Sequence, residues 1–330
     1  MKKLRLTLAC WDYDRVAALR TGDVRADGID LVFLNQPVEE TFFRMLRHKE
    51  FDIAEMSLSS YTVSLAKKEA PFIAIPVFPS RFFRHSSIYI SAKGGITRPE
   101  QLAGRRVGVP EYQMTASVWI RGMLSDEHGV KAEGVEYFTG GQEQPGRGEK
   151  LKLSLPARFR VTPIGPKQTL SQMLADGEID ALYTARAPSS FAAGAGAVRR
   201  LFPDFVQVER DYFRRTRIFP IMHTVVIRRE LYRANRWIAQ SLAKAFAKAQ
   251  RKTYQDLSET AALKAMLPWL AAHVEEARRE MGEDWWPYGY APNQKVLETF
   301  LRYHHEQGLS PRPLAPEALF APETLESFRI

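Results

Sequence analysis

The chain has 330 residues, of which 45% are hydrophobic and 26% charged, as in globular proteins of one or two domains. No apolar run approaches the length of a membrane-spanning helix, and the single Cys10 excludes an internal disulfide or a cysteine-rich metal centre. The net charge of +9 comes from scattered Lys and Arg residues without a nucleic-acid-binding signature, so neither a nucleic acid nor a membrane is expected as a partner.

Strand and helix patterns alternate through the first part of the chain. Pro37 stands at the start of one helical segment and Gly22 near the end of another, which are positions that these residues favour. The order strand, helix, strand, helix, strand is predicted for residues 4–10, 14–22, 27–34, 37–50 and 51–58. This order is typical of a parallel sheet with crossover helices.

The same order returns in the middle of the chain. Strand, helix, strand, helix, strand is predicted for residues 104–112, 113–130, 134–139, 167–178 and 179–185. The segment TFFRMLRHKEFDIAEMSLS, which starts at Thr41, aligns with TLSQMLADGEIDALYTARA, which starts at Thr169, so that Thr, Met-Leu, Glu and Asp coincide at a constant offset of 128 residues. The sequence therefore predicts two similar α/β lobes.

The remaining segments complete the predicted domain organisation. Residues 140–156 are rich in Gly, Pro and charge and are predicted to form an exposed loop, residues 219–231 one more strand, and the chain after Tyr232 mainly helices. We expect residues 1–90 to form the first part of lobe one, 91–221 lobe two, and 222–330 the return to lobe one with C-terminal helices packing on it. The predicted fold class is α/β, with a ligand cleft between two similar lobes.

The first fifteen residues start with basic residues, but the apolar run that follows is only about five residues long. A secretory signal needs a longer apolar core, so the sequence predicts a cytoplasmic location. Homo-oligomerisation is left open.

Basic groups stand directly before a predicted strand in the segment PSRFFRHSSIYI, residues 79–90. Arg81, Arg84 and His85 fall within five residues, and Ser86 follows. Charged groups are rarely buried without a partner, so these face either solvent or an anion. Because ligands of open α/β sheets bind outside the carboxyl ends of the strands, we expect this segment to line the cleft.

Several long strings in the chain resemble the 4,5-dihydroxyphthalate decarboxylase family. They are FPSRFFRHSSIYI, LAGRRVGVPEYQMTASVWIRGML, GGQEQPGR, RRTRIFPIMHTVVIRRELY and MGEDWWPYGY followed by LETFLRYHHEQGLS, and together they span almost the whole chain. The resemblance implies a fold like that of type II periplasmic binding proteins. It also implies a carboxy-lyase that removes one carboxylate from a small aromatic dicarboxylate to give protocatechuate.

This reaction requires a base for the phenol, an acid for the ring carbon and cations for the carboxylate that the ring keeps. It needs no redox cofactor, and no lysine motif suggests pyridoxal phosphate, so no cofactor and no metal are expected. Loss of the phenolic proton pushes electron density onto the carbon that bears the leaving carboxylate. Protonation of that carbon breaks aromaticity, and release of CO2 restores it.

His85, His223 and Glu111 are the candidate catalytic residues. A histidine titrates near neutral pH and suits the role of the acid, but either histidine could instead be structural. Glu111 could accept a phenolic proton or merely favour the start of the following helix. A metal held by the two histidines and a carboxylate is the alternative that their spacing alone leaves open.

The candidate substrate-binding residues are cations, hydroxyls, carboxylates and one aromatic ring. Arg81 and Arg84 suit a carboxylate because a guanidinium donates parallel hydrogen bonds, and Arg186 is the next choice. Asp12 and Asp14 could accept from a catechol, although Asp14 could instead cap a helix. The remaining candidates are Ser57, Ser86, Tyr112, Thr115 and Ser117. The segment WWPYGY is interpreted as aromatic packing among the C-terminal helices.

A binding protein or sensor for a small carboxylate that does no chemistry is the competing hypothesis. The same cleft would serve both functions, because a fold does not fix a function. An acid–base pair beside the anion site would favour the enzyme.

Overall fold

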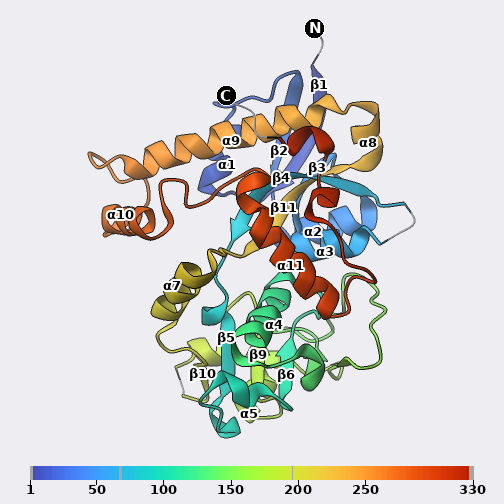
Figure 1. Cartoon of the computed structure of the whole chain (residues 1–330), viewed down its shortest axis with the longest axis vertical. Helices are drawn as coiled ribbons and strands as arrows, with labels where there is room; N and C mark the ends of the chain where they lie inside the picture. Colours follow the sequence, from blue (N-terminus) through green and yellow to red (C-terminus); the bar gives the residue numbers. More distant parts are fainter. Residues whose placement is uncertain (1–2, 67–68, 195, 327–330) are drawn as a thin grey trace. The chain divides into compact units, whose positions relative to one another are not determined.

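The computed structural model describes residues 3–66, 69–194 and 196–326. The chain folds into two compact units (Figure 1). Unit 1 contains Met1–Arg81, His223–Lys295 and Ala315–Ile330, and unit 2 contains Phe82–Met222 and Val296–Leu314. Each unit has its own sheet covered by helices, so the predicted α/β fold with two lobes is confirmed.

Sheet A belongs to unit 1 and combines parallel and antiparallel strands. Its strands in spatial order are β2 (Ile29–Asn35), β1 (Leu4–Cys10), β3 (Ile53–Ser57), β11 (Ile221–Arg228) and β4 (Phe72–Arg81). β1 is parallel to β2 and β3, as predicted, whereas β11 is antiparallel to β3. β4 is a strand that the sequence analysis missed. It contains Pro76 and Pro79, which weaken a strand pattern, and it lies last in the order of the sheet, where proline is tolerated.

Sheet B belongs to unit 2 and is also mixed. Its strands in spatial order are β10 (Val198–Arg200), β5 (Ile88–Ser91), β9 (Ala181–Tyr183), β6 (Arg106–Val109), β7 (Glu136–Thr139) and β8 (Arg160–Pro163). β6 is parallel to β7 and β9, whereas β5 is antiparallel to β9. The order β7-β6-β9-β5 therefore repeats the order β2-β1-β3-β11 of sheet A.

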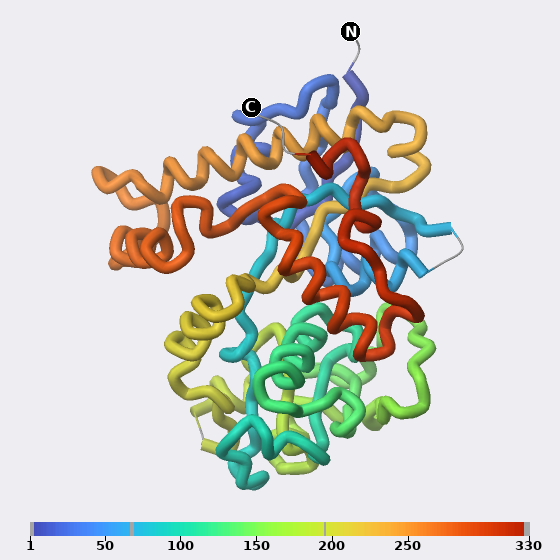
Figure 2. The backbone as a smooth tube through the Cα atoms, in the orientation of Figure 1, coloured from blue at the N-terminus to red at the C-terminus, as the bar shows by residue number. Residues whose placement is uncertain are grey.

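Most helices of unit 1 pack around sheet A, and the last one in chain order packs on the long helix before it (Figure 1). They are α1 (Asp14–Thr21), α2 (Val38–His48), α3 (Leu58–Ser64), α8 (Arg229–Ala234), α9 (Trp237–Ser258) and α10 (Leu270–Met281). In α2 the buried residues are Thr41, Phe42, Met45 and Leu46, the single apolar stripe that its sequence pattern predicts. The long helix α9 runs alongside α1 (Figure 2), and both contribute to the core over sheet A.

The helices of unit 2 are α4 (Thr115–His128), α5 (Leu170–Asp176), α6 (Ser189–Ala192), α7 (Phe205–Thr216) and α11 (Gln294–Glu306). The first ten residues of α4 are all buried, which fits its apolar sequence. Trp119 of α4 packs edge-on against Tyr303 of α11 with ring centroids 5.7 Å apart. A Cβ on Gly122 would overlap the Tyr303 ring, so glycine permits this close packing.

The two units differ from the predicted lobe boundaries at two places. Lobe one is predicted to reach residue 90, but β5 pairs with β9 and β10 and so belongs to sheet B. Residues 296–314 are predicted to lie with lobe one, but they belong to unit 2. An amphipathic pattern shows that α11 has one buried face, but it does not show which lobe covers that face.

Candidate active site

Glu55 and His223 form a close acid–histidine pair near the carboxyl end of β3. Nδ1 of His223 lies 2.5 Å from Oε1 of Glu55. In the antiparallel register of β3 and β11, His223 is opposite Ser57 and Val225 is opposite Glu55. Side chains alternate along a strand, so His223 and Glu55 project from the same face of sheet A. The ring of Phe42 packs edge-on against His223, with centroids 4.9 Å apart.

Three further donors from the end of β1 converge on the carboxylate of Glu55. The Tyr13 hydroxyl donates to Oε1 at 2.6 Å, and the Trp11 amide and the Cys10 thiol donate to Oε2 at 3.1 and 3.5 Å. Burial acts to raise the pKa of Glu55, but His223 and the hydrogen bonds outweigh it and lower that pKa. Burial and the nearby charge of Glu55 raise the pKa values of Cys10 and Tyr13. The cluster therefore holds an ionised carboxylate among neutral donors.

The pair leaves one imidazole nitrogen available for chemistry. Glu55 is fully buried, whereas 16% of the His223 side chain is exposed. The contact at Nδ1 assigns the proton there and fixes the ring orientation. Within the described residues Nε2 has no hydrogen-bond partner. An exposed ring nitrogen backed by a buried carboxylate can give or take a proton at a fixed position.

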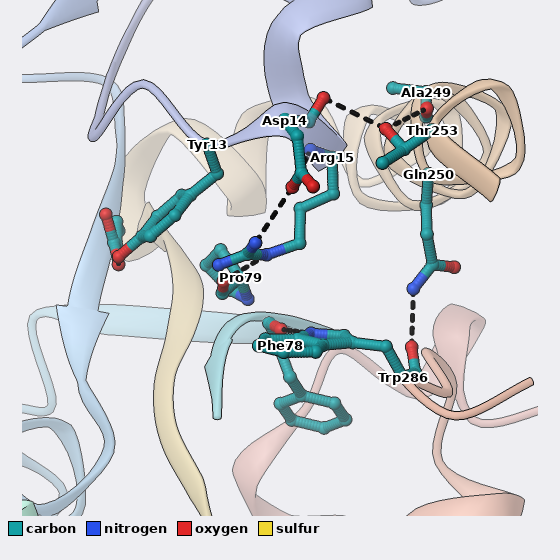
Figure 3. Close-up of polar contacts among 10 residues, drawn as sticks. Tyr13, Asp14, Arg15, Phe78, Pro79, Ala249, Gln250, Thr253 and Trp286 are labelled. Atoms are coloured by element: carbon teal, nitrogen blue, oxygen red, sulfur yellow. Dashed lines mark hydrogen bonds and ion pairs between the residues drawn. The ribbon is translucent and has the colours of Figure 1, made fainter. Parts of the chain in front are cut away.

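The two predicted aspartates near this cluster have partners of their own. Asp12 accepts from Nε of Arg20 at 2.8 Å. Asp14 Oδ1 accepts from Nη1 of Arg15 at 2.9 Å, and Asp14 does not occupy the N-cap position of α1 (Figure 3). Ser57 is buried and caps α3 by accepting from the backbone N–H of Ser60 at 3.4 Å.

Arg81 is buried in unit 1, where it fixes the aromatic segment near the C-terminal helix. Its Nη2 donates to the Pro287 carbonyl at 2.8 Å and to the side-chain oxygen of Asn293. Burial lowers its pKa to about 9. These contacts hold the Arg81 guanidinium within unit 1, and its binding of a substrate carboxylate stays a prediction.

Arg84, His85 and Ser86 lie in unit 2 and are buried. Arg84 contacts Met222 Sδ at 3.2 Å and donates to the Ala185 carbonyl at 3.4 Å, and burial lowers its pKa to about 10. The amide of Ser86 donates to Glu209 at 3.0 Å. The Ser86 carbonyl accepts from Nε of Arg200 at 3.1 Å, so this segment contacts backbone groups, a thioether, a carboxylate and a guanidinium.

His85 lies in an aromatic environment. Its ring packs edge-on against Phe202 and Tyr212, with centroids 5.6 and 5.1 Å away. Neither ring nitrogen has a hydrogen-bond partner among the described residues. Burial, with the charges of His128 and Arg215, lowers its pKa to about 4. His85 is therefore neutral at pH 7, which does not suit the acid role expected for it.

Glu111 is buried in unit 2 and held by two cations from the loop at residues 140–156. Arg147 lies 2.7 Å from its Oε1, and the Lys150 amine forms a second ion pair with the same atom. Gln113 also donates to it at 2.8 Å. Nearby, burial and the charge of Glu111 act to raise the pKa of Glu149 to about 7, although the Tyr112 amide donates to it.

The other predicted residues of unit 2 occupy varied environments. Tyr112 is buried, with its hydroxyl donating to the Gln307 carbonyl at 3.2 Å and its ring under Arg121. Thr115 and Ser117 are buried in the first turn of α4, and the Ser117 hydroxyl has no partner among the described residues. Arg186 is exposed.

Sequence reasoning missed Glu55, the central residue of the cluster in unit 1. A signal was present, because Glu55 stands between apolar residues in the middle of the predicted strand FDIAEMSL, and an acid in a buried strand needs partners. The partners Tyr13 and His223 could not be assigned, since Glu55 and His223 are 168 positions apart.

Among the described residues, no group of three or more His, Cys, Asp or Glu side chains could hold a metal ion, and no helix is long and apolar enough to cross a membrane.

Comparisons with known proteins give two strong matches in sequence, although no family model matches the chain. A 4,5-dihydroxyphthalate decarboxylase of Comamonas testosteroni is 46% identical over 330 residues, which cover 100% of both chains. A 4,5-dihydroxyphthalate decarboxylase of Pseudomonas putida is 48% identical over 214 residues, which cover 65% of this chain and 83% of the relative.

Solved structures give matches in fold. The periplasmic sulfonate-binding protein SsuA of Methylobacillus flagellatus KT aligns with a TM-score of 0.55 and 13% identity over 98% of this chain and 92% of its own. The aliphatic sulphonate binding protein SsuA of Escherichia coli aligns with a TM-score of 0.53 and 14% identity over 98% and 99%. At this identity the likeness concerns the fold alone, and it confirms the predicted periplasmic-binding-protein-like fold.

Proposed function

Because the chain belongs to the 4,5-dihydroxyphthalate decarboxylase family, we propose that it converts 4,5-dihydroxyphthalate to protocatechuate and CO2. The identity of 46% over the full chain confirms the family that the sequence analysis named. The structural observation that supports decarboxylation is the ionised, buried Glu55 bound to a partly exposed His223. A cytoplasmic location is part of this proposal.

His223 is the proposed proton donor to the ring. The phenol para to the leaving carboxylate loses its proton to water, which raises the electron density on the carbon that bears the carboxylate. Nε2 of His223 then protonates that carbon and forms a C–H bond. The C–CO2 bond breaks, its electron pair restores the aromatic ring, and water returns a proton to the phenolate and to His223. The net reaction consumes one proton, as decarboxylation of a carboxylate requires.

Glu55 supports this step by position and charge. Its carboxylate binds Nδ1 of His223 and fixes the ring orientation, so that Nε2 is the nitrogen left for the substrate ring. Tyr13 and Trp11 hold Glu55 ionised in its buried site. The proposal thus places the acid on sheet A and leaves His85 and Glu111 with structural roles.

The test is incubation of the purified protein with 4,5-dihydroxyphthalate, with CO2 and protocatechuate as the readouts. In deuterated water we expect one deuterium on the ring carbon that lost the carboxylate. His223→Asn should lower kcat by about 100-fold or more, whereas His48→Gln, which changes an exposed histidine of α2, should match the wild type. Binding of the substrate without CO2 release would favour the binding-protein hypothesis instead.

A further inference from the structure

Arg15 is held in an aromatic sandwich that leaves one edge of its guanidinium available. Its Cζ lies 4.1 Å from the ring centroid of Tyr13 and 4.3 Å from that of Trp286 (Figure 3). Rings on both faces block approach from above and below, so a ligand can reach the guanidinium only in its own plane. The arrangement fixes the direction of the remaining N–H groups before any ligand arrives.

The hydrogen bonds of Arg15 show which of its N–H donors are still available to a ligand. Nε donates to the Pro79 carbonyl at 2.6 Å, and Nη1 donates to Asp14 at 2.9 Å. Among the described residues Nη2 has no partner. A guanidinium has five N–H donors, so both donors of Nη2 and one of Nη1 are left. Two of these three donors are enough for the parallel hydrogen bonds by which a guanidinium binds a carboxylate.

Arg15 is largely buried and held in place by its neighbours, as in a preformed binding site and unlike a mobile surface cation. Only 16% of the Arg15 side chain is exposed, whereas the Asp14 side chain is 50% exposed, so water screens the aspartate charge. Trp286 is itself fixed, since its indole N–H donates to the Phe78 carbonyl at 2.8 Å and its carbonyl accepts from Gln250 (Figure 3).

A buried hydroxyl stands two positions along the chain from Trp286, whose ring covers Arg15. This hydroxyl of Tyr288 has no hydrogen-bond partner among the described residues. Burial raises its pKa, so it remains a neutral O–H donor. A buried hydroxyl without a partner costs free energy, and an anion on Arg15 would supply the missing acceptor.

The position of Arg15 relative to His223 suits an aromatic substrate whose ring carries a carboxylate. The Tyr13 ring that covers Arg15 ends in the hydroxyl that donates to Oε1 of Glu55, the same atom that contacts His223. The Tyr13 side chain therefore contacts both the guanidinium of Arg15 and the carboxylate of the acid–histidine pair. We propose that Arg15, with Tyr288, binds the carboxylate that the aromatic ring keeps, an inference whose ligand class rests on the proposed function.

The experiment compares protocatechuate, which has the retained carboxylate, with catechol, which lacks it, by calorimetric titration. In the wild type we expect protocatechuate to bind more tightly than catechol. Arg15→Gln should weaken protocatechuate binding by about 30-fold or more while catechol affinity changes by less than about threefold. Tyr288→Phe should weaken protocatechuate binding by about fivefold. Arg20→Gln, which changes the other arginine of α1, is the matched control and should alter neither.

Turnover separates this role from a structural one. The retained carboxylate stays bound through the reaction, so Arg15→Gln should raise KM for 4,5-dihydroxyphthalate with kcat changed little. Equal losses for catechol and protocatechuate would mean that Arg15 only supports the fold and would overturn the inference. Unchanged protocatechuate affinity would overturn it too. Absence of CO2 release from the wild type would refute the proposed function, yet the titrations would still test Arg15.

Discussion

The strand that follows the second crossover helix ends differently in the two sheets. In sheet A, β3 places Glu55 beside His223, and in sheet B, β9 places Tyr183 at the position that the offset of 128 residues makes equivalent. Both side chains are fully buried, and both strands lie between a parallel neighbour and an antiparallel one. Glu55 has several partners, whereas the Tyr183 hydroxyl has none among the described residues.

The buried carboxylates of the two units, Glu55 and Glu111, also differ in the kind of partner that they bind. Glu55 is bound to a histidine that keeps a free, partly exposed nitrogen, whereas Glu111 is neutralised by Arg147 and Lys150. A carboxylate held by permanent cations stabilises a loop, but it orients no proton donor. The two lobes share one architecture, yet a carboxylate is paired with a histidine in sheet A and with two permanent cations in unit 2.

Glu55→Gln should have the largest effect of the substitutions considered, a loss of turnover. An amide keeps the shape of the carboxylate but loses its charge, which weakens the hydrogen bond that orients the His223 ring, so kcat should fall by about 100-fold or more. The measurement is kcat for CO2 release, with thermal unfolding as the check that the variant is folded. A folded Glu55→Gln enzyme with wild-type kcat would remove the pair from the mechanism.

Glu111→Gln should affect stability rather than turnover. Loss of one member of a buried ion pair is destabilising, and because Arg147 can turn to solvent we expect a cost of about 2 kcal/mol. Urea unfolding measures this cost, and kcat should stay within about threefold of the wild type. A large loss of kcat at unchanged stability would instead indicate that Glu111 takes part in catalysis.

His85→Phe should alter the pH dependence of stability. The folded-state pKa of His85 is lowered from 6.5 to about 4, so the unfolded chain binds the extra proton first and the wild type loses stability as the pH falls through this window. Phenylalanine suits the contacts with Phe202 and Tyr212 and carries no proton. The variant should therefore be more stable than the wild type at pH 4 by about 2 kcal/mol, relative to their difference at pH 7.

Chemical unfolding at several pH values measures this effect. Turnover at pH 7 should be close to that of the wild type, in contrast to His223→Asn. Parallel stability curves for His85→Phe and the wild type between pH 7 and pH 4 would contradict the buried, neutral state of His85.

Tyr183→Phe should have the smallest effect. It removes a buried hydroxyl that has no partner among the described residues, so the free energy of unfolding should change by less than about 0.5 kcal/mol or rise slightly. Urea unfolding and kcat are the measurements. A destabilisation above about 1 kcal/mol would show that the hydroxyl has an acceptor, and the contrast with Glu55 would weaken.

Sequence patterns predicted the repeated β-α-β-α-β order in both lobes, the two-lobed α/β class and the family, although they missed β4. Apolar periodicity encodes which face of a helix or strand is buried, and it did so for α2 and for the strands around Glu55. It also selected His223 as a candidate, because few side chains titrate near neutral pH. It did not separate His223 from His85, since both stand in segments of similar composition.

The partners of the charged groups became known from the folded structure. Arg81 is held by carbonyl and amide oxygens, whereas Arg15 lies between two rings contributed by segments at opposite ends of the chain. The same holds for Glu55 and His223, which come from strands far apart in the sequence. Periodicity reports burial along one element, but desolvation and hydrogen bonding depend on atoms that chain folding brings together from elsewhere.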